Sequence, residues 1–184
     1  MTRSLAATLL LLTLAACGGG TTTDPGPDPD ETLGEDRDAV TGMDDTAGGD
    51  LPVTGEATYT GSAEVTAAGG ISAIGAATIE VDFEAGEASG DALDFSISGA
   101  DAAGALSIDG AIIDTGTDGP GQLNAEIGGA ITAGDGTALV VFPLDAVGNF
   151  TGADGSGIEL TGDGTVSVDG VEGDGAVAVF VLAE

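Results

Sequence analysis

Beyond residue 50, apolar and polar side chains alternate one by one, and this alternation limits most of the chain to β-structure. In the clearest segment, Ala77, Ile79, Val81 and Phe83 alternate with polar residues. The pattern recurs in segments 56–65, 93–98 and 123–132. A period of two is typical of strands that bury one face and expose the other. No comparable helical periodicity follows the first 16 residues.

Glycine-rich turn signals separate these segments. Less regular runs follow at 106–113, 138–142, 157–161, 165–171 and 175–182. The turn signals are Gly69-Gly70, Gly119-Pro120-Gly121, Asp135-Gly136, Asp154-Gly155, Asp163-Gly164 and Asp174-Gly175. Short strands joined by tight turns form a meander, and closing the meander removes its sticky edges. We therefore predict an all-β fold, an antiparallel up-and-down β-barrel of about eight strands.

Two other β-architectures fit the sequence less well. A parallel β-solenoid needs turns at a fixed period, and these turns have none. A membrane-spanning barrel shows the same alternation with its faces reversed, but it needs aromatic girdles at both interfaces. The chain has six aromatic residues and ends in Leu182-Ala183-Glu184. A soluble barrel is the better interpretation.

Small residues mark the predicted inward face. They are Ala57, Gly61, Ala63, Ala77, Ala125 and Gly129. Such residues fit a narrow packed barrel or a barrel with one small cavity, and we favour the packed form. The only tyrosine, Tyr59, is expected to be a core anchor with a hydrogen-bonded hydroxyl. The five phenylalanines are expected in the core or at its ends: Phe83, Phe95, Phe142, Phe150 and Phe180.

Residues 1–16 have the features of a lipoprotein signal peptide. Arg3 precedes an apolar run at 5–14 that is too short to span a bilayer. The run leads into Leu14-Ala15-Ala16-Cys17, which resembles a bacterial lipobox. This resemblance implies cleavage between Ala16 and Cys17 and acyl chains on Cys17, the only cysteine. Gly18 stands where Asp would resemble an inner-membrane retention signal, so we expect an outer-membrane destination.

Segment 17–50 is rich in Gly, Pro and Asp and has few apolar residues. Low hydrophobicity combined with high charge is typical of disorder. We predict a disordered acidic tether that links the lipid to a barrel domain at 51–184. A short helix within 31–40 is compatible with this sequence but not required.

The charge balance excludes several functions. The chain has 32 acidic residues, Arg3 and Arg37, no Lys and no His, for a net charge of −30. Nucleic-acid binding depends on Lys and Arg, so we expect none. The sequence lacks imidazole and lysine amine groups, so we expect that the protein is not an enzyme. We expect a monomer, and adaptation to salt explains the acidity without any ligand.

Calcium binding is an alternative explanation for the acidic turns. Ca²⁺ takes six to eight oxygen ligands. The best candidates are Asp154 with Asp163, or Asp114 with Asp118. However, Asp-Gly also favours hairpin turns, and no EF-hand loop is present. Apart from the lipid, we expect no cofactor.

Several short motifs resemble the transferrin-binding protein B β-barrel family of lipoproteins. They are the stretch GEATYTG at 55–61, Val81-Asp82-Phe83 followed by Ser89-Gly90, Ile108-Asp109-Gly110, and Asn149-Phe150-Thr151-Gly152. The resemblance implies a surface or periplasmic lipoprotein that presents a barrel. The family's transferrin receptor has two lobes, and this chain has room for one barrel. Transferrin binding is not implied, and no binding residue can be carried over.

Two functions remain open at this stage. The first is an outer-membrane-anchored lipoprotein whose barrel binds a protein or a small solute, or mediates surface contact. The second is a structural envelope lipoprotein with a filled barrel and no small ligand. An apolar cavity with a few convergent polar groups would favour the first, and a filled interior would favour the second.

Overall fold

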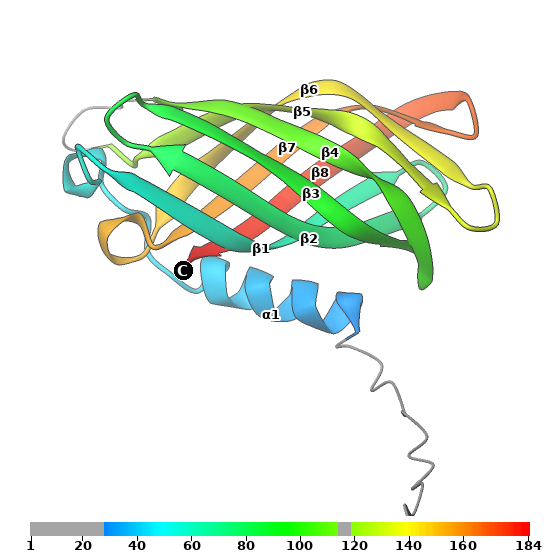
Figure 1. Cartoon of the computed structure of the whole chain (residues 1–184), viewed down its shortest axis with the longest axis horizontal. Coiled ribbons are helices and arrows are strands. Elements are labelled where there is room, and N and C mark those ends of the chain that lie inside the picture. The colour runs from blue at the N-terminus through cyan, green and yellow to red at the C-terminus, as the bar shows by residue number, and fades with distance from the viewer. Residues whose placement is uncertain (1–27, 114–118) are drawn as a thin grey trace, which may run out of the picture.

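A computed structural model describes residues 28–113 and 119–184 of the chain (Figure 1). The helical elements are α1 (Pro29–Thr41) and the short 3₁₀ turns η1 (Gly48–Asp50) and η2 (Ala153–Gly155). The strands are β1 (Glu56–Ala67), β2 (Ile71–Asp82), β3 (Glu87–Ile97), β4 (Ala100–Ile113), β5 (Gln122–Ala133), β6 (Ala138–Thr151), β7 (Gly157–Val168) and β8 (Val171–Ala183).

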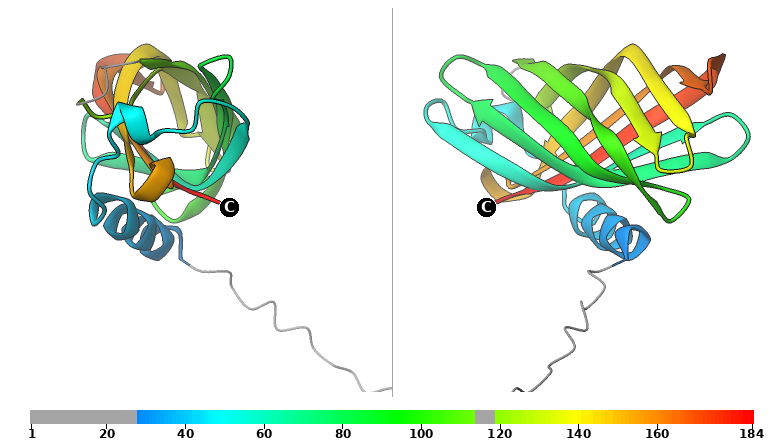
Figure 2. Two further views of the ribbon diagram at one scale, coloured as in Figure 1. Left: turned by 90° about the vertical axis from the view of Figure 1, so that its left-hand side faces the viewer. Right: turned by 45° about the vertical axis from the view of Figure 1, so that its right-hand side comes forward.

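The eight strands form one closed antiparallel barrel in sequence order, which confirms the predicted fold class. Each strand pairs with the next, and β8 returns to β1 from Tyr59↔Ala183 to Ala67↔Gly175. Seen end-on, the strands enclose a narrow lumen (Figure 2, left). Closure gives every strand a neighbour on both sides and leaves no edge strand.

Two hairpins at one end have two-residue turns in which both residues have positive φ. Ser98-Gly99 has φ values of 52° and 80°, and Asp169-Gly170 has 51° and 82°. These values are those of type I′ turns, whose twist matches the flanking strands. The second turn lies inside the run 165–171, which the sequence pattern had suggested as a strand.

The predicted turns at Asp163-Gly164 and Asp174-Gly175 are wrong. Gly164 pairs with Gly175, and Thr165 pairs with Asp174, in the middle of the β7–β8 hairpin. Side chains from other strands need this space: a Cβ at Gly164 would lie 2.9 Å from the Cβ of Leu144. These glycines therefore permit packing inside the barrel and do not make turns.

The lumen is filled by side chains, as expected for a narrow packed barrel. One continuous apolar cluster runs through it, built from the inward-facing positions of all eight strands. The largest fully buried side chains are Tyr59, Phe95, Phe150, Ile79, Leu106, Ile108, Leu123, Ile127, Ile131, Leu139, Ile158 and Leu160. Phe83 packs against this cluster, with its ring centroid 6.0 Å from that of Phe150.

Two of the five phenylalanines do not enter the lumen, which corrects the sequence expectation. Phe142 is 39% exposed on the outside of β6, where the register with β5 shifts between Ile127 and Gly129. Phe180 points outward from β8 and is covered by α1. Its neighbours Val179 and Val181 hold the inward positions, so strand alternation forces Phe180 to the outer face.

The folded unit begins before residue 51, so the prediction of a disordered tether is wrong for 28–50. Leu33 and Val40 are too sparse to form a core of their own, but α1 buries both against the barrel. After α1, the chain crosses one end of the barrel (Figure 2, left), where Thr46 exchanges backbone hydrogen bonds of 2.8 Å with Phe150 and Gly121. Tertiary contacts therefore order a segment whose composition alone suggests disorder.

Candidate functional site

Several predicted site residues lie outside the described residues. They are the predicted cleavage site at Ala16, the predicted lipidation site Cys17, and the calcium candidates Asp114 and Asp118. Lipidation of Cys17 stays a prediction from the sequence. Within residues 28–113 and 119–184, no helix has the length and apolar character needed to cross a bilayer.

The structure places the other calcium candidates on separate elements. Asp154 is exposed in η2 with φ 56°, and Asp163 is exposed in the middle of β7. Across the described part of the chain, no group of three or more His, Cys, Asp or Glu side chains is arranged to hold a metal ion. Two separate carboxylates supply too few oxygens for Ca²⁺. Calcium binding stays a prediction without a ligand cluster in these residues.

Tyr59 is a core anchor, as predicted. Its side chain is buried, and its hydroxyl donates a 2.7 Å hydrogen bond to the carbonyl oxygen of Gly155. Its ring meets Phe150 edge-on, with 6.3 Å between centroids. Burial disfavours the phenolate and raises the pKa of Tyr59 to about 12. The hydroxyl is therefore held protonated and engaged within the protein.

Tyr59 is the one polar side chain at the inward-facing strand positions that the structure describes. The other buried polar side chains are Thr46, Ser62, Thr151 and Ser167. Thr46 lies in the segment across the barrel end, and the remaining three sit beside inward-facing residues and face away from the lumen. Sites for polar solutes need several convergent polar groups. This lumen offers one hydroxyl, and Gly155 already occupies it.

The outer surface of β1–β4 carries a concave groove of about 570 Å³. Its lining includes five carboxylates: Glu56, Glu80, Asp82, Glu87 and Asp109. The strand register sets Asp82 directly opposite Glu56 on one side and Glu87 on the other. Like charges in direct cross-strand positions repel each other. The groove is therefore a region of concentrated negative charge.

A second row of carboxylates continues around the barrel. Asp109 on β4 pairs with Glu126 on β5, and Glu126 pairs with Asp145 on β6. The barrel sequence from residue 56 onward contains no Lys, Arg or His to offset these charges. The outside of the barrel thus combines a groove with a strongly negative surface, which attracts cations and repels anions over a distance.

Helix α1 covers a different outer face, formed by β8, β1 and β2 (Figure 1). Leu33 and Val40 lie about two helical turns apart on one face of α1, and both pack with Ile74 and Phe180. Burying two aliphatic side chains contributes about 3–6 kcal/mol before the cost of ordering the helix. The start signals of α1 were present in the sequence: Asp28 caps the helix and Pro29 occupies its first turn.

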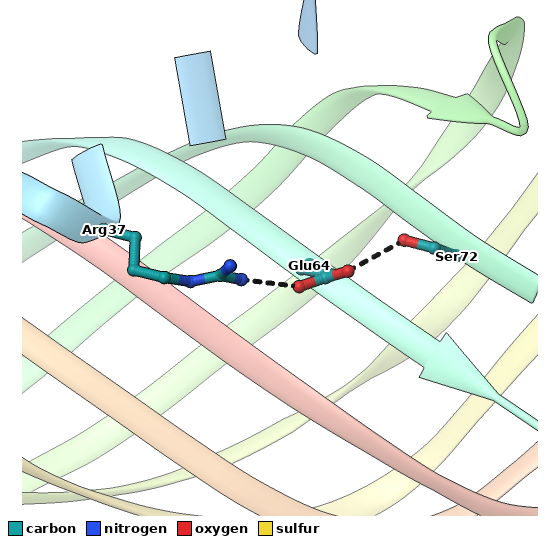
Figure 3. Close-up of polar contacts among 3 residues, drawn as sticks. All are labelled: Arg37, Glu64 and Ser72. Atoms are coloured by element: carbon teal, nitrogen blue, oxygen red, sulfur yellow. Dashed lines mark hydrogen bonds and ion pairs between the residues drawn. The ribbon is translucent and has the colours of Figure 1, made fainter. Parts of the chain in front are cut away.

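Arg37 links α1 to the barrel through one side chain (Figure 3). Its Nη2 donates to Oε2 of Glu64 at 2.8 Å, and the other oxygen of Glu64 accepts from the Ser72 hydroxyl at 3.0 Å. The guanidinium carbon lies 5.1 Å from the ring centroid of Phe180. One further link joins the Ser62 hydroxyl to Asp36. A partly exposed ion pair and a cation–π contact are each worth up to about 1 kcal/mol.

Opposing these contacts is the repulsion between α1 and the barrel. Residues 28–41 contain six carboxylates and Arg37, and the barrel carries further carboxylates and no basic residue from residue 56 onward. Two unit charges about 15 Å apart in water repel by roughly 0.3 kcal/mol, and many such pairs add up at low salt. Physiological salt, with a screening length of about 8 Å, removes most of this repulsion. Salt weakens the direct contacts of Arg37 with Glu64 and Phe180 much less.

No protein-family model and no curated protein sequence matches this chain. The candidate functional surfaces therefore rest on geometry and charge. They are the acidic groove on β1–β4 and the face of β8, β1 and β2 that α1 covers. The sequence predicted the barrel but missed both surfaces, because each joins residues from several strands.

Proposed function

We propose that this protein is a lipid-anchored envelope protein whose barrel acts through its outer surface and not through its lumen. The filled interior carries this proposal. Its inward-facing positions hold apolar side chains, glycines and one engaged tyrosine hydroxyl. A barrel packed in this way leaves its exterior as the surface available for contact.

The membrane half of the proposal depends on the lipobox-like sequence that ends at Cys17. Acyl chains on Cys17 would anchor the protein stably. The resemblance to transferrin-binding protein B β-barrel lipoproteins supports the same arrangement, a lipid followed by a soluble barrel. Gly18 supports the outer membrane as the destination.

A labelling experiment tests the anchor. Cells that express the chain are grown with a radiolabelled fatty acid, and the wild type is compared with Cys17→Ser. We expect label and membrane fractionation for the wild type, and neither for the variant. Unlabelled wild-type protein in the soluble fraction would contradict the anchor.

The filled lumen argues against a small solute bound inside the barrel and in that respect favours the structural envelope role, which is our alternative. It leaves contact through the outer surface open. Capture experiments separate the two roles. The full chain is immobilised and incubated with the organism's own medium or with host proteins. A variant with Glu80→Gln, Asp82→Asn and Glu87→Gln in the groove is treated in the same way. A partner that binds the wild type and is lost with the groove variant supports surface contact. Recovery of only secretion and lipidation machinery supports the structural role.

A further inference from the structure

We propose that α1 is a salt-controlled strap, docked on the outer face of β8, β1 and β2 when charges are screened and released when they are not. The proposal concerns residues 28–42. It requires that α1 be held weakly, that its release be local, and that charge decide between the two states. The structure supports each requirement separately.

The helix depends on the barrel for its existence. It has 13 residues, a length at which isolated helices are marginal in water even for favourable sequences. Gly34 lies in its middle, and its acidic residues continue to Asp38 near the C-terminus, where the helix dipole disfavours them. Undocking and unfolding of α1 are therefore one event.

The two ends of α1 are held unequally. Val40 in the last turn is fully buried, whereas Pro29 in the first turn is exposed. Two cavities of about 170 and 180 Å³ adjoin Pro29, and Ile74 lines both of them. Both are pockets open to solvent, so apolar surface at this end of α1 stays in contact with water and contributes little to docking. Release therefore begins at the N-terminal turn.

The far end of the strap is fixed at Gly42, which caps α1. Immediately beyond it, Asp45 and Ala47 form bridges to Thr151 and Pro120, and Thr46 is buried. These contacts belong to the barrel end and do not involve α1. The motion is confined to residues 28–42 and leaves the barrel closed.

Charge sets the direction of the salt response. Docking places the six carboxylates of residues 28–41 beside a barrel without a cation, so the long-range term opposes docking. Arg37 is the one basic residue in the described chain, and its contacts with Glu64 and Phe180 are short. Added salt removes the long-range repulsion more completely than it weakens these contacts. High salt therefore favours the docked strap.

Release has two structural consequences. It uncovers the apolar outer patch of Ile74, Ala178, Phe180 and Leu182. It also converts a helix about 20 Å long into a chain segment that can extend to about 45 Å. If Cys17 anchors the protein, as proposed above, release would lengthen the tether; the docking equilibrium itself does not depend on that anchor.

Hydrogen exchange of the full chain, followed by mass spectrometry, tests the strap. The exchange of peptides from α1 is measured relative to peptides from β3 at salt concentrations of about 0.01 M and 1 M, where the screening lengths are about 30 and 3 Å. We expect exchange in α1 to be at least tenfold faster at low salt. Equal relative exchange at the two salt concentrations would overturn the proposal.

Three variants assign the effect to local charge. Glu35→Gln removes an exposed charge from α1 and should slow its exchange at low salt several-fold. Glu126→Gln changes the net charge equally but lies on β5, four strands from β1 around the barrel, and should have little effect on α1. Arg37→Gln should speed exchange at both salt concentrations. Equal effects of Glu35→Gln and Glu126→Gln would show that net charge acts globally, and this result would overturn the strap.

Discussion

The hydroxyl of Tyr59 donates a hydrogen bond to the carbonyl oxygen of Gly155, 96 residues later in the chain. The bond joins the first strand to the turn between β6 and β7, where Phe150 packs against the tyrosine ring. The bond attaches η2 to the inward face of β1 at one end of the barrel. Because both groups are buried, the bond cannot be replaced by water.

This bond predicts how the stability of the protein depends on pH. Burial raises the pKa of Tyr59 to about 12 in the folded protein, above the ordinary value of 10.0. The folded state then holds the proton more tightly than the unfolded state. The stabilisation is fully present below about pH 10 and is lost as the pH rises towards 12, by up to about 3 kcal/mol.

Urea unfolding at about pH 8 and near pH 12 measures this effect. The interpretation is simplified because the sequence has no lysine and no second tyrosine. Tyr59→Phe should cost about 1–3 kcal/mol at pH 8, since the Gly155 carbonyl loses its partner. The variant should also lose little further stability on going to high pH. A decline as steep as that of the wild type would contradict the assignment to Tyr59.

A second prediction concerns the close contact between β6 and β7 at Gly148. A Cβ built at this position would overlap the carbonyl oxygen of Glu159 on the neighbouring strand. Gly148→Ala should therefore lower the free energy of unfolding by about 2–3 kcal/mol. Gly134→Ala is the matched control, because nothing lies within 4 Å of its Cβ. Urea unfolding of both variants measures the two changes in the free energy of unfolding. An equal loss of stability in both variants would contradict the packing argument.

The barrel could be predicted from sequence because strand alternation is a local property. Ala77 to Phe83 show their inward and outward faces without reference to any other strand. Closure then follows from the number of strands and the cost of free edges. Turn positions were harder to predict. Asp163-Gly164 and Asp169-Gly170 have similar composition, and only the packing of Leu144 against Gly164 distinguishes them.

The surfaces could not be predicted because they depend on contacts distant in sequence. Leu33 and Val40 look too sparse for a core until Phe180 supplies the partner surface. Phe180 in turn looks like a residue of the barrel core until it is known which residues of β8 face inward. The acidic rows require the register of β4, β5 and β6, which the sequence does not specify. Strand alternation therefore predicted the barrel, whereas the acidic rows and the face covered by α1 depend on contacts between distant parts of the chain.

The calcium candidates give a third prediction. Asp154 and Asp163 lie on different elements, so we expect calorimetric titration with millimolar Ca²⁺ to give no saturable heat beyond weak ion accumulation. Asp154→Asn should behave like the wild type. Saturable binding that this substitution abolishes would establish a site at η2.

The fourth prediction follows from the position of Glu126 between two carboxylates. Its cross-strand partners are Asp109 on β4 and Asp145 on β6, and like charges in such positions destabilise a sheet. Glu126→Gln should therefore raise the free energy of unfolding at low salt by about 0.5–1 kcal/mol. The gain should shrink at about 1 M salt, where the screening length is about 3 Å.

The matched control for Glu126 is Glu172→Gln. Glu172 is exposed on β8, and its cross-strand partner on β7 is the uncharged Ser167. Both substitutions change the net charge by the same amount, so they share the effect of overall self-repulsion. Urea unfolding at low and high salt should show a larger gain for Glu126→Gln at low salt only. Equal gains would mean that the total charge of the barrel, and not the pairing of carboxylates along its strands, limits its stability.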